Sequence, residues 1–225
     1  MSTDDKRPRK LESVPLAEAF PSLEIPQLSE EEWAERDAKI AAEKAKTLDA
    51  AAIASLKAHD AELQAAGFPR RAIEKARGAD ETRPGIVRLK NWSTDDDSCV
   101  VLSGTHGCGK TVAATWWAIR RRPIPMFVRA STFAASSRYD RDTRLSWFAA
   151  SALVLDDLGS EFSDVKGSFL VDLDELIDVF YGDRRPLLIT TNAEMPEFKS
   201  RYGARIVDRL RECGSWFSVI GGSLR

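Results

Sequence analysis

The sequence is poor in the residues from which proteins build zinc sites, catalytic triads and disulfide frameworks. Its 225 residues include 2 histidines, His59 and His106, which leave little room for a histidine-based metal site or a Ser-His-Asp triad. The 3 cysteines, Cys99, Cys108 and Cys213, are odd in number, far apart and without a C-x-x-C pair. These counts argue against a disulfide scaffold and favour a protein of the reducing cytosol.

Long apolar runs are also missing, and neither sign of charge dominates. We find no stretch of about 18 apolar residues, which a transmembrane helix needs. Residues 4–10 are mostly charged, so the N-terminus lacks the apolar core of a signal peptide. We therefore expect a cytoplasmic protein with no membrane partner. Because 33 Lys and Arg residues are balanced by 35 Asp and Glu residues, any contact with nucleic acid must use a local basic patch.

The N-terminal part of the chain predicts a flexible arm followed by a long helix. Residues 1–28 contain four spaced prolines among charged and polar residues, a composition typical of flexible segments. Ser29 and Glu32 form a capping box and Gly67 is a stop signal, so we predict a helix over residues 29–66. Its large apolar residues form a thin stripe, namely Trp33, Ile40, Leu48, Leu56 and Leu63. Such a stripe cannot hold a core alone, so we expect this helix to pack on itself or on another protein.

From about residue 85 onward, short apolar runs alternate with helical stretches. Strands are expected at residues 99–102, 125–128, 152–155, 187–190 and 216–220, and helices at 111–122, 165–181 and 204–212. This alternation predicts a parallel sheet covered on both faces. A further short helix is expected from Pro69 to about residue 77, ended by Gly78. We therefore divide the chain into an arm (1–28), a helical partner-binding module (29–84) and an α/β domain (85–225).

Residues 104–111 (GTHGCGKT) fit the P-loop pattern G-x-x-x-x-G-K-[ST], directly after a predicted strand and before a predicted helix. In such a loop the glycines let backbone N–H groups surround phosphates, and the helix adds its positive N-terminal end. The expected nucleotide-binding residues are Gly104, Thr105, His106, Gly107, Cys108, Gly109, Lys110 and Thr111. We expect Lys110 to reach the β- and γ-phosphates and Thr111 to bind Mg²⁺.

Polar residues follow two of the later strands. Residues 153–157 (LVLDD) end in two acids: Asp156 would hold Mg²⁺ through water, and Asp157 would polarise the attacking water. Residues 187–192 (LLITTN) end in a polar cluster, in which Asn192 is expected to orient that water. The alternative is that these residues only cap a strand or form a turn. Since one more strand separates the P-loop from the paired acids, we expect the P-loop class with an extra strand beside the P-loop strand.

In this order the motifs resemble those of the AAA+ ATPases, and among them the bacterial and phage DnaC-like helicase loaders and the IstB-like transposition helper ATPases. The matching segments are 63–69 (LQAAGFP), 155–161 (LDDLGSE), 190–192 (TTN), 202–210 (YGARIVDRL) and 221–225 (GGSLR). The resemblance implies a P-loop NTPase with a five-stranded parallel sheet, no C-terminal lid, and ATP and Mg²⁺ as cofactors. It also implies an arginine finger, with Arg209 the first candidate and Arg205 the second; a surface arginine is the alternative.

A cluster of basic and aromatic residues lies between the second strand and the paired acids. Its members are Arg138, Tyr139, Arg141, Arg144, Trp147 and Phe148. Such residues can bind single-stranded DNA through phosphate contacts and base stacking. Because Asp140 and Asp142 dilute the positive charge, a solvated helix with a packed tryptophan is the alternative.

Taken together, the sequence predicts an ATPase that loads a hexameric replicative helicase on single-stranded DNA. The helical module would bind the helicase, and ATP would induce self-association of the ATPase domain. One alternative is a transposition helper ATPase that binds duplex DNA and a transposase. A P-loop kinase of a small metabolite and an inactive adaptor that only binds helicase are the others.

Overall fold

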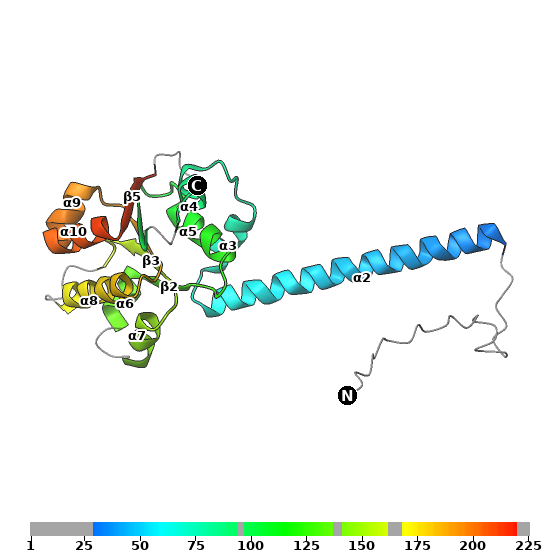
Figure 1. The fold of residues 1–225 in the computed structure, drawn as a ribbon, viewed down its shortest axis with the longest axis horizontal. Coiled ribbons are helices and arrows are strands. Elements are labelled where there is room, and N and C mark those ends of the chain that lie inside the picture. The colour runs from blue at the N-terminus through cyan, green and yellow to red at the C-terminus, as the bar shows by residue number, and fades with distance from the viewer. Residues whose placement is uncertain (1–28, 94–96, 137–140, 162–167, 220–225) are drawn as a thin grey trace, which may run out of the picture. The chain divides into compact units, whose positions relative to one another are not determined.

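The computed structural model of the protein describes residues 29–93, 97–136, 141–161 and 168–219. The expected flexible arm (1–28) and the C-terminal run 221–225 lie outside these residues. The chain forms two compact units, Met1–Ile53 and Ala54–Arg225, and Figure 1 labels most of their helices and strands. We describe each unit by itself.

Helix α2 (Glu30–Ala65) confirms the long helix expected over residues 29–66. It starts with the expected capping box, in which the Ser29 N–H donates to Glu32 Oε2 at 2.8 Å and the Glu32 N–H donates to Ser29 Oγ at 3.3 Å. Its large apolar side chains from Trp33 to Leu56 are 42–70% exposed, whereas Leu63 is fully buried. Neither this helix nor any other described one is long and apolar enough to cross a membrane.

The second unit is built on a five-stranded parallel sheet, as predicted. The strands are β1 (Cys99–Ser103), β2 (Met126–Arg129), β3 (Leu153–Leu158), β4 (Leu187–Thr191) and β5 (Gly214–Ser218). In the order β2-β3-β4-β1-β5, strand β4 lies between the P-loop strand β1 and the acidic strand β3. Strand β5 begins at Gly214 and not at residue 216, because Gly214 runs directly against β1. A Cβ at Gly214 would lie 1.7 Å from the Cys99 carbonyl oxygen.

Helices cover both faces of this sheet (Figure 1). One face carries α3 (Arg70–Arg77), α4 (Pro84–Lys90) and α5 (Lys110–Ile119), and the other carries α6 (Ala130–Ser136), α7 (Arg141–Phe148), α8 (Ser168–Gly182), α9 (Met195–Tyr202) and α10 (Ala204–Glu212). Alternate residues of β1 supply the two cores: Val100 and Leu102 pack toward α3–α5, and Val101 packs toward α8–α10. Helix α5 ends at Ile119 and not at residue 122.

The end of α2 and the residues that follow it are packed into the same core as the sheet. Leu63, Phe68 and Ile73 share an apolar cluster with Val100 of β1. Gly67 makes the turn after α2 with a φ of 99°, which glycine adopts without strain. The compact unit that holds the sheet therefore begins within α2, at Ala54.

Candidate functional site

The P-loop connects β1 to α5 with backbone conformations that depend on glycine. Gly107 and Gly109 have φ values of 83° and 96°, in the left-handed region. Such a loop, together with the first turn of a helix, presents backbone N–H groups that bind anions. Gly104 has another role, because a Cβ there would lie 2.4 Å from the Val219 carbonyl oxygen. The first glycine of the motif thus lets the loop pass closely along the chain that leaves β5.

Lys110 connects the P-loop to the end of β4. Its side chain is buried, and Nζ donates to the carbonyl oxygens of Gly104 at 2.7 Å and Thr105 at 3.0 Å. The same Nζ donates to Asn192 Oδ1 at 2.8 Å. Two of the predicted site residues, 82 positions apart in the sequence, are therefore in direct contact. Cys108 of the same loop lies with Sγ 3.7 Å from Nζ.

The residues expected to hold Mg²⁺ are also in contact. Thr111 Oγ1 donates to Asp156 Oδ1 at 2.9 Å, which joins the start of α5 to β3. Hydroxyl and carboxylate oxygens are the hard ligands that Mg²⁺ prefers. Among the described residues, no group of three or more His, Cys, Asp or Glu could hold a metal ion. This donor set fits Mg²⁺, which is usually bound by one or two protein groups together with waters and substrate phosphates.

Asp156 also accepts from a residue to which the sequence assigned no role. Thr190 Oγ1, at the end of β4, donates to Asp156 Oδ1 at 2.7 Å and accepts from the Asp157 N–H at 2.8 Å. Thr190 thereby fixes both acids of the LVLDD strand. Burial raises the pKa of Asp156, although the hydrogen bonds from Thr190 and Thr111 act in the opposite direction.

Asp156→Asn is expected to stabilise the protein when nucleotide and Mg²⁺ are absent. A raised pKa in the folded state means that the buried charge costs stability above the ordinary carboxyl pKa, and that this cost disappears below it. Asparagine is uncharged and keeps an oxygen for the two threonines, so we expect a gain of about 1 kcal/mol at neutral pH. Thermal unfolding of both proteins measures this gain at about pH 7.5 and about pH 4. If the stability gained by Asp156→Asn were larger at about pH 4 than at about pH 7.5, the pKa of Asp156 would not be raised by burial.

Asp157 occupies an unusual backbone conformation at the end of the site. Its φ is 59°, a value that non-glycine residues adopt only where surrounding contacts hold them. Asn192 Nδ2 donates to Asp157 Oδ1 at 2.7 Å. Asn192 therefore bridges Lys110 through its oxygen and Asp157 through its nitrogen. The carboxyl ends of β1, β3 and β4 bring together two groups, Lys110–Asn192–Asp157 and Thr111–Asp156, and Thr190 connects them into one network.

The two candidate finger arginines lie apart from this network, on α10 facing α8. Arg209 Nη1 pairs with Asp174 Oδ1 at 3.0 Å and also with Asp178. Arg205 pairs with Asp174 at 3.1 Å. The side chain of Arg209 is 25% exposed and that of Arg205 is 68% exposed. The structure thus places both arginines in one ion-pair cluster with two acids and does not bring them to the P-loop.

In the cluster of basic and aromatic residues that the sequence suggested for DNA binding, the described side chains pack against the core or form ion pairs. Trp147 is buried in the core, and Phe148 packs against the same core. Arg144 pairs with Asp172 and with Glu175, each at 2.7 Å. Of the others, Arg138 and Tyr139 and the side chain of Arg141 lie outside the described residues. For α7 the structure supports the alternative, a helix with a packed tryptophan, because a buried ring cannot stack on bases.

Comparison with family models and with curated proteins finds no match for this sequence. Solved structures do match. DnaI is 18% identical with a TM-score of 0.56, and the match covers 68% of this chain and 95% of that chain. A proposed primosome component from Streptococcus pyogenes serotype M3 is 15% identical with a TM-score of 0.54, and the match covers 73% of this chain and 98% of that chain.

The replication initiator DnaA bound to AMPPCP and single-stranded DNA also matches. It is 17% identical with a TM-score of 0.50, and the match covers 68% of this chain and 46% of that chain. At these identities the likeness shows the fold. Together with the P-loop between β1 and α5 and the position of β4, it confirms the expected class: the chain has the AAA+ P-loop fold, with a five-stranded parallel sheet.

Proposed function

We propose that this protein is a Mg²⁺-dependent ATPase that loads a hexameric replicative helicase on single-stranded DNA. The observation that carries the ATPase part is the hydrogen-bonded chain from Lys110 through Asn192 to Asp157, beside the Thr111–Asp156 pair. A phosphate-binding lysine, a pair of oxygen ligands and a carboxylate for water are the parts that nucleotide hydrolysis needs.

In this proposal each residue has a defined task. The backbone N–H groups of residues 104–111 and Lys110 hold the β- and γ-phosphates. Thr111 and Asp156 hold the metal, which when bound neutralises charge on the phosphate oxygens. Asp157 accepts a hydrogen bond from the attacking water, and Asn192 orients that water while fixing the Asp157 carboxylate. Hydrolysis then depends on Asp157, whereas binding depends on Lys110.

The role in replication is supported by the kind of protein that shares this fold. The fold is shared with DnaI, with a proposed primosome component and with an initiator that binds AMPPCP and single-stranded DNA. The motif resemblance to helicase loaders points in the same direction. A transposition helper ATPase remains the second candidate, since its motifs are similar. Preference for single-stranded over duplex DNA and binding to a helicase, but not to a transposase, separate the two.

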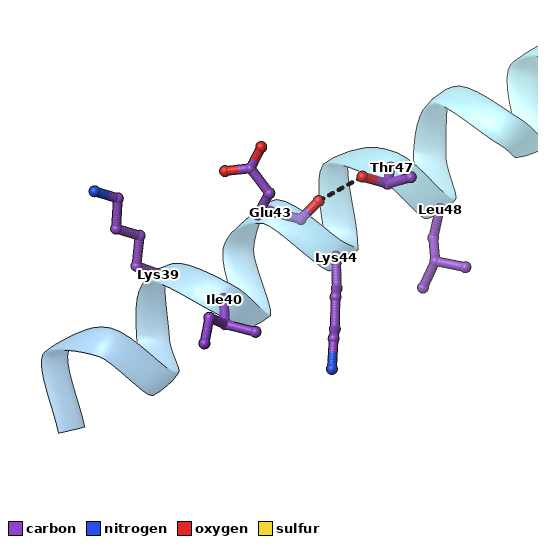
Figure 2. A pocket seen from close by; sticks show the side chains of 6 residues that line it. All are labelled: Lys39, Ile40, Glu43, Lys44, Thr47 and Leu48. Atoms are coloured by element: carbon purple, nitrogen blue, oxygen red, sulfur yellow. Dashed lines mark hydrogen bonds between the residues drawn. The ribbon is translucent and has the colours of Figure 1, made fainter. Parts of the chain in front are cut away.

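The partner-binding surface that we propose is the first part of α2. Figure 2 shows Ile40, Lys44 and Leu48 in one row along the helix and Lys39, Glu43 and Thr47 in the neighbouring row. Together these residues form an open surface along α2. Ile40 is 44% exposed and Leu48 is 70% exposed. Apolar side chains at this spacing on one helix side fit a partner that supplies a hydrophobic groove.

Removing residues 1–53 is expected to leave a folded domain that binds ATP and no longer binds helicase. The cut leaves Leu63 and Phe68 in the core and keeps the whole compact unit from Ala54 onward. Helicase binding is measured by immobilising the hexamer and titrating each protein, and ATP binding by calorimetry. We expect at least about a 10-fold loss of helicase affinity and an unchanged affinity for ATP.

A matched pair of full-length variants tests the surface itself. Ile40→Asn with Leu48→Asn removes the apolar side chains of this row, and Glu35→Asn with Lys46→Asn changes the opposite side of the helix, at about 100° per residue. Only the first variant should weaken helicase binding. If the truncated protein still binds helicase with the affinity of the full chain, α2 is not the partner-binding segment.

A further inference from the structure

A second buried carboxylate lies close to the hydrolytic network. Glu161, at the end of the LDDLGSE segment, is 6% exposed. Its Oε1 accepts from the Tyr202 hydroxyl at 2.5 Å and pairs with Arg201 at 3.0 Å, while Oε2 accepts from the Gly159 N–H at 2.8 Å. Burial and the hydrogen bond to Glu161 raise the pKa of Tyr202, so the phenol stays protonated and donates. The carboxylate is thus satisfied by donors from two separate segments.

One of these donors belongs to the turn that holds Asp157. Two residues after Asp157, Gly159 has a φ of 115°, and the Ser160 N–H donates back to the Asp157 carbonyl oxygen at 3.0 Å. The Gly159 N–H is fixed by Glu161. Since the φ of 59° at Asp157 must be held by its surroundings, Glu161 closes the turn that keeps it there.

The other donors belong to the helix that leads to the candidate fingers. Arg201 and Tyr202 are the last residues of α9, and Gly203, with φ 88°, joins α9 directly to α10. Arg201 also donates to the Glu161 carbonyl oxygen at 3.0 Å. Arg205 and Arg209 follow within the first two turns of α10. Glu161 therefore connects the α9–α10 segment to the backbone beside Asp157.

We propose that Glu161 is a positioning residue for ATP hydrolysis, which holds Asp157 in place and couples it to the α9–α10 segment through Tyr202 and Arg201. This inference rests on the proposed ATPase activity. It assigns Glu161 no contact with nucleotide, so Glu161 should affect turnover and leave nucleotide affinity unchanged. A displaced carboxylate of this kind can cost about 10²-fold in rate.

Two conservative variants test this coupling. Glu161→Gln keeps the size of the side chain but has one acceptor oxygen in place of two, so either Gly159 or the α9 donors lose their partner. Tyr202→Phe removes one hydroxyl from the same carboxylate. The matched control is Tyr181→Phe, because Tyr181 donates to Glu212 at 2.9 Å in an exposed pair of the same chemistry. Each full-length protein is assayed for kcat, for the ATP dissociation constant and for thermal unfolding.

We expect kcat to fall about 10–100-fold in Glu161→Gln and by a smaller factor in Tyr202→Phe. The ATP dissociation constant should stay within about twofold, and Tyr181→Phe should hydrolyse ATP like the wild type. If wild-type protein hydrolyses ATP and both Glu161→Gln and Tyr202→Phe keep its kcat, the inference is overturned. Equal losses of ATP affinity and kcat would also overturn it, because a general structural defect produces that pattern. If the wild-type protein itself binds ATP without hydrolysing it, the proposed function fails instead.

Discussion

Replacing Lys110 with alanine is expected to weaken ATP binding by about 100-fold or more. The lysine is 7% exposed, and its ammonium group lies among carbonyl and amide oxygens at the mouth of the P-loop. These oxygens are left without their cation in the variant, and the phosphates lose a charge-assisted contact. Calorimetric titration with a non-hydrolysable ATP analogue measures the effect directly, in the presence of Mg²⁺.

Asp157→Asn is the matched comparison, because it changes the same network at its other end. The amide still contacts Asn192, and the Thr111–Asp156 pair is untouched, so ATP should bind with wild-type affinity. Turnover should fall about 100-fold or more, since an amide cannot accept a proton from water. Wild-type turnover in Asp157→Asn, or normal ATP affinity in Lys110→Ala, would contradict the roles assigned to these residues.

The strands were predictable because each is a short apolar run, and the sheet buries both of its faces. Strands β1 and β4 follow the predicted positions to within one residue, since they lie in the middle of the sheet with every residue buried. The edge strand β5 is only half-buried, so apolar residues marked its position poorly. Helices α4, α6 and α9 were not predicted, because each is only 7 or 8 residues long and shows little apolar periodicity.

The P-loop and the paired acids were predictable because their chemistry is local in sequence. What could not be predicted depends on contacts between distant segments. Thr190 reaches Asp156 across 34 positions, and Tyr202 reaches Glu161 across 41. For Trp147 the sequence suggested stacking on DNA bases, but the side chain is buried in the core. An aromatic residue near arginines has the same sequence pattern in both cases. Only the packing of α7 against the sheet decides that it is buried.

Arg209 presents a related case, in which the structure adds a constraint to the predicted finger. An arginine finger acts from a neighbouring subunit, and such contacts are head-to-tail, which produces rings or open filaments. Within its own chain Arg209 pairs with Asp174 and Asp178. To act in trans, the Arg209 guanidinium must break its ion pairs with Asp174 and Asp178 and contact the γ-phosphate of the ATP bound to the neighbouring subunit. The two acids therefore compete with a neighbouring phosphate for the arginine.

Arg209→Ala is therefore expected to bind ATP normally and to hydrolyse it about 10³-fold more slowly, the lower end of what such fingers contribute. Asp178→Asn is the matched control, because it weakens the same ion pair and keeps the arginine. It should hydrolyse ATP at least as fast as the wild type. If Asp178→Asn is as slow as Arg209→Ala, the arginine matters for the packing of α8 and α10 and not as a finger.

Mixing Arg209→Ala with Lys110→Ala gives the decisive measurement. The Arg209→Ala subunit keeps an intact P-loop, and the Lys110→Ala subunit keeps an intact Arg209. Where the two are neighbours, the arginine of the second can therefore complete the ATPase site of the first. In an equal, random mixture, about a quarter of the head-to-tail interfaces combine an intact P-loop with an intact Arg209. We expect ATPase activity to return toward that fraction of the wild-type rate. The same mixture made with Arg205→Ala in place of Arg209→Ala tests the second candidate. If mixed assemblies form, as cross-linking would show, and yet neither mixture is more active than its parts, neither arginine acts in trans.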